Sequence, residues 1–189
     1  NTHTLLCPPD VGNWHSRRLK VFSGEQKVII RSHHRRLIAH RGNLEGPNPD
    51  KENHPDYIHK AVTQGYEIEV DLWRVESDLF LGHDSPQYRI NEKYLDLIAS
   101  TGMLWTHVKN AEAFDYLVSH NKQQWNFFWH QEDDYTLTSL GYIWAYPGKK
   151  LTNNSICVLP ERANYDTLSI QSSKGVCTDY VYKYEKLLE

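Results

Sequence analysis

The sequence has little cysteine, no long hydrophobic run and almost no net charge, and each shortage excludes a class of protein. Its 189 residues include three cysteines, Cys7, Cys157 and Cys177, which are far apart and form no CxxC pair. Neither a disulfide framework nor a thiolate zinc site is therefore expected. No apolar run approaches the roughly 20 residues that a membrane-spanning helix needs, so the sequence predicts no transmembrane segment.

The balance of charges argues against a polyanion-binding surface. Lysine and arginine number 21 against 24 aspartate and glutamate residues, which gives a formal net charge of -3. Such a chain generates no strong positive field, so nucleic acid is not an expected partner. The chain begins without an initiator methionine or a hydrophobic signal stretch. Together with the low cysteine content, these features favour a cytoplasmic location.

Histidine and large aromatic side chains are plentiful instead. There are 11 His, 12 Tyr and 6 Trp, whereas the apolar share is only 39%. The length suits one domain with a single core. Residues 1–36 differ in character from the rest of the chain and are interpreted as an N-terminal arm or incomplete segment, with the folded domain at residues 37–189.

From residue 37 onward, short apolar or alternating runs are interleaved with amphipathic stretches. Helices are predicted at residues 53–64, 92–100 and 110–120. Strands are predicted at residues 37–40, 66–72, 78–82, 103–108, 125–129, 141–145, 156–159 and 176–180. Strands that alternate with helices are typical of parallel sheets. Because predicted helices become sparse after residue 120, we expect an α/β fold, a compact TIM-type (β/α) barrel with abbreviated helices in its second half.

Polar side chains lie at the ends of the first predicted strands. His40 ends the first strand and His83 comes directly after the third. Between them, Glu69 and Asp71 lie near the end of the second strand, where the period of two puts both carboxylates on one face. In a parallel barrel such residues meet at one mouth. Two carboxylates there would repel each other, and a divalent cation such as Mg²⁺ or Ca²⁺ relieves that repulsion.

The same set contains the groups that cleavage of a phosphodiester requires. His40 and His83 suit the roles of general acid and general base. A metal ion and the planar guanidinium of Arg41 can neutralise charge on the phosphoryl oxygens. The residues by themselves therefore indicate phosphodiester chemistry.

The ordered motifs His-Arg-Gly at His40, Glu-x-Asp at Glu69 and His-Asp at His83 resemble the signature of the glycerophosphodiester phosphodiesterases. These enzymes belong to the broader phosphatidylinositol-phospholipase-C-like superfamily. The resemblance covers residues 37–85 and includes the pair Glu52-Asn53. It implies a TIM-type barrel with a bound Mg²⁺ or Ca²⁺. It further implies an acid/base pair, two metal ligands and a phosphate contact, namely His40 and His83, Glu69 and Asp71, and Arg41.

Two departures from the family pattern accompany this resemblance. On the next predicted strand, Lys109 matches a phosphate-contacting lysine, whereas His107 stands where the family has a metal-binding glutamate. Imidazole is a better ligand for Mn²⁺ or Zn²⁺ than for Mg²⁺ or Ca²⁺, so the four cations remain candidates. Residues 174–180 resemble the closing strand of such barrels. The chain from residue 37 is also shorter than family barrels usually are, so its substrate-selecting loops differ.

These departures leave alternative interpretations open. The expected substrate is a small-molecule or lipid-derived phosphodiester. The same site could instead serve a lyase or transferase acting on a lipid- or glycan-linked phosphodiester, or a degenerate barrel that binds a phosphorylated ligand without catalysis. Further rim candidates are residues 129–134, Tyr146 and Glu161. Trp144 and Tyr146 fit a wall that stacks on sugar or glycerol, although core packing explains the tryptophan at least as well.

Overall fold

In a computed structural model, the described residues are 18–21, 24–27 and 35–188. Strands β1 (Arg18–Val21) and β2 (Gly24–Lys27) pair antiparallel in a sheet of their own. The predicted N-terminal arm, residues 1–36, otherwise lies almost wholly outside the described residues. The first strand of the main sheet begins at Arg36, one residue before the predicted domain start.

The main sheet has ten strands, seven of which run parallel in the order β8-β7-β4-β3-β12-β11-β10. The hairpin strands β5 and β6 extend it antiparallel beside β4, and β9 pairs antiparallel with β10. The strands are β3 (Arg36–His40), β4 (Glu67–Val75), β5 (Asp78–Leu81), β6 (Tyr88–Ile90), β7 (Leu104–Val108), β8 (Asn126–Phe128), β9 (Tyr135–Leu137), β10 (Ile143–Ala145), β11 (Ser155–Val158) and β12 (Gly175–Thr178).

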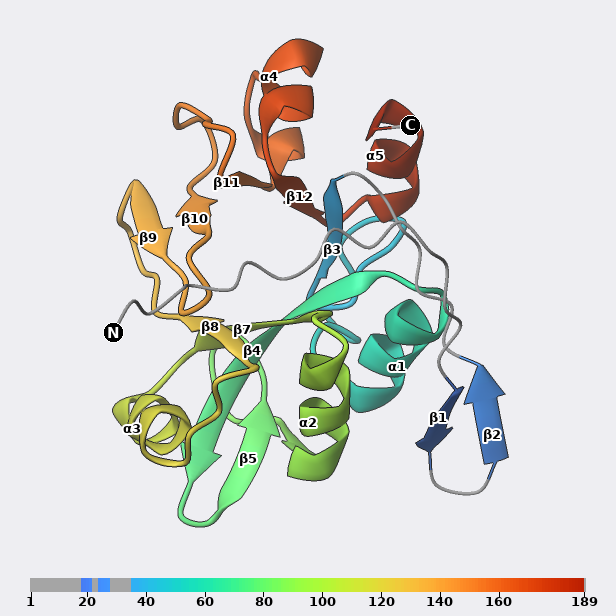
Figure 1. The fold of residues 1–189 in the computed structure, drawn as a ribbon, viewed down its shortest axis with the longest axis vertical. Coiled ribbons are helices and arrows are strands. Elements are labelled where there is room, and N and C mark those ends of the chain that lie inside the picture. The colour runs from blue at the N-terminus through green and yellow to red at the C-terminus, as the bar shows by residue number, and fades with distance from the viewer. Residues whose placement is uncertain (1–17, 22–23, 28–34, 189) are drawn as a thin grey trace, which may run out of the picture.

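Helices accompany mainly the first half of this sheet (Figure 1). They are α1 (Pro55–Thr63), α2 (Glu92–Ser100), α3 (Ala111–Ser119), the 3-10 turn η1 (Pro160–Arg162), α4 (Thr167–Ser172) and α5 (Val181–Leu188). Within the described chain, loops alone connect β8, β9, β10 and β11. The mixed α/β fold and the sparse helices of the second half are confirmed. A full TIM barrel, with a helix after every strand, is not what the structure shows.

The sheet curls so that two of its parts, called arms here, face each other. One arm contains β7 and β8 and the other contains β10, and aromatic rings from both arms meet inside the sheet. The ring centroid of Trp144 on β10 lies 5.8 Å from that of Trp105 on β7 and 4.5 Å from that of Phe128 on β8. Neither strand is a neighbour of β10 in the sheet. The arms are also linked through the segment after β9, where the Ser139 amide donates to the Phe127 carbonyl at 2.9 Å.

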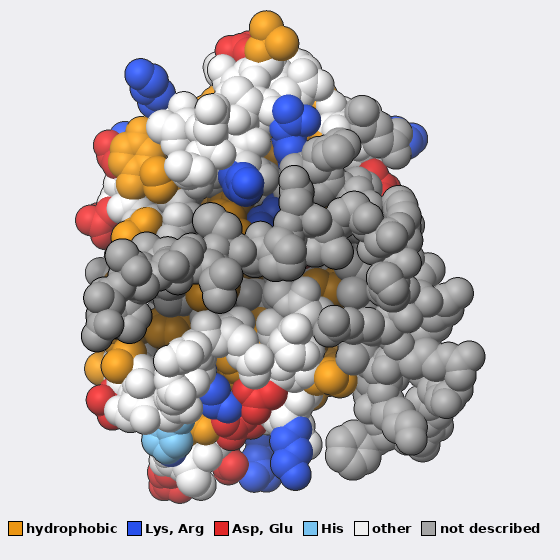
Figure 2. Space-filling view, in the orientation of Figure 1, with side chains coloured by type: hydrophobic (Ala, Val, Ile, Leu, Met, Phe, Trp, Pro, Cys, Tyr) orange, Lys and Arg blue, Asp and Glu red, His pale blue; other side chains and the backbone are white. Residues whose placement is uncertain are grey.

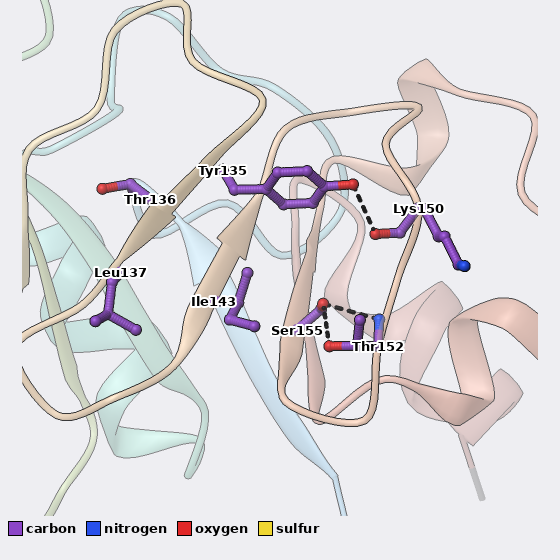
Figure 3. Close-up of a pocket in the computed structure, with 7 residues that line it drawn as sticks. All are labelled: Tyr135, Thr136, Leu137, Ile143, Lys150, Thr152 and Ser155. Atoms are coloured by element: carbon purple, nitrogen blue, oxygen red, sulfur yellow. Dashed lines mark hydrogen bonds between the residues drawn. The ribbon is translucent and has the colours of Figure 1, made fainter.

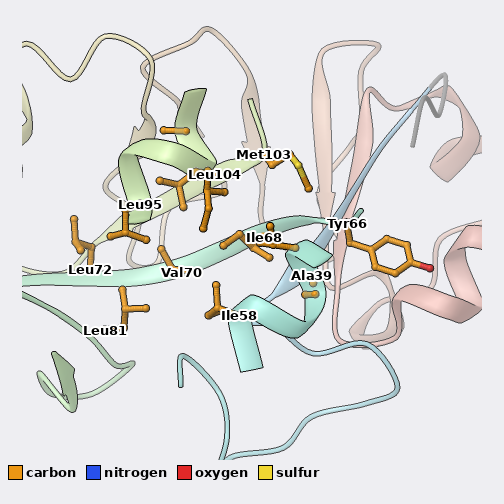
Figure 4. Packing of buried hydrophobic residues seen from close by; sticks show 14 of the residues in the cluster. Ala39, Ile58, Tyr66, Ile68, Val70, Leu72, Leu81, Leu95, Met103 and Leu104 are labelled. Atoms are coloured by element: carbon orange, nitrogen blue, oxygen red, sulfur yellow. The ribbon is translucent and has the colours of Figure 1, made fainter. Parts of the chain in front are cut away.

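Strand β4 has one face toward the helices and the other toward the inside of the curled sheet. Its residues Ile68, Val70 and Leu72 are buried in the cluster between the sheet and the helices, where Ile58 of α1 and Leu95 of α2 also lie (Figure 4). Successive side chains of a strand point to opposite faces. The intervening residues Glu67, Glu69 and Asp71 therefore face the inside of the curled sheet. Burial of the apolar series thus fixes the orientation of both predicted metal-binding carboxylates.

A polar cluster lies inside the curled sheet at the ends where its strands begin. The Arg36 guanidinium donates to both carboxylate oxygens of Glu67 at 3.0 Å and to the Tyr142 hydroxyl at 2.7 Å. The indole N–H of Trp105 also donates to Glu67, at 2.6 Å. Burial raises the pKa of Glu67, although Arg36 and Trp105 partly offset this. This end is opposite to the one where the predicted site residues lie.

The outer face of the second half carries an open pocket instead of a helix (Figure 3). The pocket has a volume of about 440 Å³. Tyr135, Leu137 and Ile143 form its apolar part, with Lys150, Thr152 and Ser155 beside them. Ile143 precedes the inward-facing Trp144, so the pocket lies on the opposite face of the sheet from the interior.

In the view of Figure 2, no charge of one sign dominates the visible described surface. Acidic and basic side chains are interspersed on that face. This distribution agrees with the small net charge. Among the described residues, no helix is long and apolar enough to cross a bilayer.

Lys122 joins helices α2 and α3 and provides a test of their packing. Its ammonium group contacts Glu92 and donates to Asp96 at 2.8 Å. Burial opposes ionisation of Glu92, but hydrogen bonds from Lys122 and Tyr116 outweigh it and lower the pKa of Glu92. We expect Lys122→Met to reduce the free energy of unfolding at pH 7 by about 1 kcal/mol, near the upper value for partly exposed ion pairs.

The pH dependence of this loss results from the lowered pKa. The contribution of Glu92 is present above its unfolded pKa of about 4.3 and is lost as the pH falls through the lower folded value. Urea denaturation should therefore give a smaller difference between wild type and Lys122→Met at pH 3 than at pH 7. Lys93→Met, at an exposed position on α2, is the matched control. A difference that is the same at both pH values contradicts this account.

Candidate active site

The predicted site residues converge where the parallel strands end. Ile38, Trp105 and Cys177 belong to the hydrophobic cluster inside the curled sheet. His40 and His107 each come two residues after one of these interior side chains, and so does Asp179. The period of two therefore directs all three polar side chains inward, one layer above the interior cluster.

Glu69, Asp71 and His107 form the one cluster of potential metal ligands found among the described residues. One ligand atom from each lies within 4.8 Å of the others. Glu69 is 2% and Asp71 0% exposed, so these carboxylates do not lie on a solvent-exposed face of the strand. Burial and the Asp71 carboxylate raise the pKa of Glu69. Burial would also raise the pKa of Asp71, but the adjoining His107 and Arg41 outweigh it and lower that pKa.

The hydrogen bonds of His107 define which ring nitrogen faces the carboxylates. Its Nε2 lies 2.7 Å from the backbone carbonyl of His130, which can only accept, so Nε2 carries a proton. Nδ1 faces Oδ1 of Asp71 at 3.1 Å. Oδ1 is buried and accepts no well-aligned hydrogen bond from any described residue. A cation between the two atoms would satisfy both, and a backbone carbonyl is a common partner for the second nitrogen of a metal-bound histidine.

His40 is held by a carboxylate that sequence analysis assigned no role. Its Nδ1 lies 2.7 Å from Oδ1 of Asp179, which also accepts from Asn43 at 2.9 Å. The other carboxylate oxygen of Asp179 accepts from Arg162 at 3.3 Å. Burial opposes the charged imidazole, but Asp179 and Glu69 outweigh it and raise the pKa of His40. The arrangement fixes the ring and leaves Nε2 free to face the mouth.

His83 has a similar partner but is more exposed. Its Nδ1 lies 2.7 Å from the Asp84 carboxylate, so Asp84 orients the ring and is more than a turn residue. Burial and the positive charge of Arg41 lower the pKa of His83. Arg41 acts in the same direction on His40. Both predicted acid/base histidines therefore lie within the electrostatic reach of one guanidinium.

The two predicted phosphate contacts are already paired with carboxylates. Arg41 donates to Glu52 at 3.0 Å, and its Nε lies 3.1 Å from Asp71. The ammonium group of Lys109 lies 3.6 Å from Asp71. Both cations are thus held beside Asp71.

Asparagines supply support that sequence analysis did not assign. Asn53 donates to the Asp71 carboxylate at 2.8 Å and accepts from the Asp71 amide at 2.9 Å. Its backbone φ of 64° is a left-handed conformation that asparagine adopts more readily than most residues. Asn43 links Asp179 to Glu52. The loop between β3 and α1 therefore holds both Asp71, which belongs to the cluster of potential metal ligands, and Asp179, which contacts His40.

The remaining rim candidates separate into structural and exposed residues. Glu161 accepts from the Thr178 hydroxyl and the Asp179 amide, at 2.9 and 2.8 Å, and so anchors η1 to β12. Trp144 is buried in the interior cluster and belongs to the core. Tyr146 is exposed at the end of β10, beside His130.

The described geometry thus provides two histidines held by carboxylates, an acidic pair with an imidazole, and fixed cations. Such a set can bind a divalent cation and an anion and can transfer protons on either side of it. No family model, curated protein or solved structure matches the chain.

Proposed function

We propose that the chain is a metal-dependent phosphodiesterase that uses His40 and His83 as its acid/base pair. The observation that carries this proposal is the buried Glu69–Asp71–His107 cluster beside a histidine that Asp179 holds at 2.7 Å. In this proposal the curled sheet is a compact TIM-type barrel with most of its second-half helices missing. The substrate is a small-molecule or lipid-derived phosphodiester.

Glu69, Asp71 and His107 would hold the divalent cation. The fit rests on the donor set, because Nδ1 of His107 faces Oδ1 of Asp71 at 3.1 Å and one ligand atom from each of the three residues lies within 4.8 Å of the others. When bound, the cation neutralises charge on the phosphoryl oxygens. Two carboxylates and one imidazole suit Mn²⁺ or Zn²⁺ at least as well as Mg²⁺ or Ca²⁺.

The histidines supply the proton transfers on either side of the phosphorus. Asp179 and Asp84 hold the Nδ1 atoms of His40 and His83, so each ring presents Nε2. One ring takes a proton from the attacking hydroxyl while the other gives a proton to the leaving oxygen. Arg41 and Lys109 attract the phosphodiester through their charge and orient it.

The first test is metal-dependent hydrolysis of bis(p-nitrophenyl) phosphate after dialysis against a chelator. We expect the rate of p-nitrophenol release to return when Mn²⁺, Mg²⁺, Zn²⁺ or Ca²⁺ is added. Glu69→Gln should weaken Mn²⁺ binding, measured by electron paramagnetic resonance, at least about tenfold, because loss of even an outer partner of a metal ligand costs 10–100-fold.

The control for this test is Glu112→Gln, at an exposed position on α3. It should bind Mn²⁺ as the wild type does. Hydrolysis that no divalent cation stimulates, or Mn²⁺ affinity that Glu69→Gln leaves unchanged, contradicts the proposed function.

A further inference from the structure

The proposed chemistry uses mainly the middle strands of the parallel order and leaves β8, β11 and β10 without a role. Its groups come from β3, β4, β7 and β12, and from the segment after β5. The phosphorus must lie between His40 and His83, over these middle strands. A substituent on the phosphate that does not point into solvent therefore extends over the ends of β8, β10 and β11.

Two aromatic side chains lie just beyond β8 and β10, the strands at the two ends of the parallel order. His130 comes two residues after Phe128, and Tyr146 comes two residues after Trp144, where Phe128 and Trp144 both belong to the interior cluster. The ring centroids of His107 and His130 are 6.4 Å apart, and those of His130 and Tyr146 are 5.7 Å apart. A continuous series of rings thus leads from the cluster of potential metal ligands to Tyr146.

Backbone contacts fix this aromatic surface and leave the outer ring free. The His130 ring contacts the Asp133 carbonyl at 2.7 Å, and the Tyr146 amide donates to the Asp134 carbonyl at 3.0 Å. The side chain of Tyr146 is 43% exposed, and its hydroxyl has no hydrogen-bond partner among the described residues. A surface that is already ordered loses little entropy when it binds a ligand.

The charged groups Lys109, Arg162 and Asp134 next to these rings are each paired with a group of opposite charge. Lys109 extends from β7 beside β8, and Arg162 comes after β11 beside β10. On the acidic side, Asp134 is paired with Lys149 at 2.7 Å. Lys109 and Arg162 are paired in the same way with Asp71 and Asp179, so stacking is the contact that these rings offer to an alcohol group.

We infer that Tyr146 and His130 form a subsite that stacks on a ring in the alcohol group of the substrate. The inference rests on the proposed function and deepens it, because the expected phosphodiester then carries a cyclic alcohol instead of glycerol. Tyr146 supplies the exposed face, and His130 holds that face at a fixed distance from the phosphate.

Binding of inert phosphate analogues tests the subsite independently of turnover. Calorimetry with Mn²⁺ present compares phenylphosphonate, methylphosphonate and phosphocholine. The wild type should bind phenylphosphonate about three- to tenfold more tightly than methylphosphonate, the range expected for one aromatic stacking contact. Tyr146→Ala should remove this preference without changing the affinity for methylphosphonate, and Tyr146→Phe should keep it.

The matched control is Tyr135→Ala, which removes an equally exposed tyrosine, also 43%, from the outer pocket of Figure 3. It should keep the preference for phenylphosphonate. Equal affinities in the wild type, a preference that survives Tyr146→Ala, or tightest binding of phosphocholine overturns the subsite but leaves the phosphodiesterase proposal standing. If none of the three compounds binds, the phosphate site itself is wrong and both proposals fail.

Discussion

Asp179→Asn should lower kcat for bis(p-nitrophenyl) phosphate about 1000-fold, although the residue need not touch the substrate. Its carboxylate receives three side-chain donors, from His40, Asn43 and Arg162. An asparagine offers one oxygen and one NH₂ group to these three donors, so at least one donor–donor contact results. The charge that stabilises a protonated His40 is lost as well, and removal of such a carboxylate partner costs up to about 10⁴-fold in serine proteases.

A double variant distinguishes positioning of His40 from a general structural role. If Asp179 acts through His40, then His40→Ala combined with Asp179→Asn should be no slower than His40→Ala alone, because residues that act as a unit are not additive. Asp84→Asn is a matched variant at the exposed histidine. Since water can replace much of that contact, we expect a fall of about tenfold or less. Additive losses, or full activity in Asp179→Asn, contradict the role given to Asp179.

The sequence predicted those parts of the fold that local patterns determine. Helices α2 and α3 begin where expected, because Asn91 and Asn110 accept hydrogen bonds from the first turns of these helices. The alternation in β4 correctly placed Glu69 and Asp71 on one face, since burial of Ile68 and Val70 requires it. In each case the information lies within a few residues.

Features that depend on distant partners were not predicted. Strand β9 and helix α4 are short and lack a strong periodic pattern. The curl of the sheet agrees with the expected barrel, but the contact between the rings of Trp105 and Trp144, which are far apart in sequence, was not predicted. The pairing of His40 with Asp179 spans 139 positions. The local signals for Asp179 were its place two residues after an apolar strand residue, Cys177, and the resemblance of residues 174–180 to a closing strand, and neither assigned it a role.

The pairing of Arg41 with carboxylates was likewise not predicted from the motifs. The sequence predicted Arg41 as a phosphate contact, and in the structure the guanidinium is first of all the partner of Glu52 and Asp71. The position of a motif along the strands indicates which residues lie close together. Which charged side chains form ion pairs depends on every charged group near them, including groups outside the motif. This is why the residues that lie close together were easier to predict than the ion pairs that they form.

The largest loss of stability is expected at the contact between Arg36 and Glu67, which lies at the end of the sheet where the strands begin. We expect Arg36→Met to reduce the free energy of unfolding by about 3 kcal/mol, because it leaves the Glu67 carboxylate without its charged partner in a largely enclosed position. The indole of Trp105 would remain as a donor to that carboxylate, but it carries no charge. Urea denaturation at pH 7 measures the loss.

The double variant Arg36→Met/Glu67→Gln should recover most of this free energy, since the isolated charge is then absent. The pH dependence gives a second criterion. Because the pKa of Glu67 is already raised and loses the opposing effect of Arg36, the single variant should be less destabilised at pH 5 than at pH 8. A loss below about 1 kcal/mol, or no recovery in the double variant, would mean that solvent reaches the carboxylate. The polar cluster would then be an exposed ion pair, and packing of Trp105 and Tyr142 would close this end of the sheet by itself.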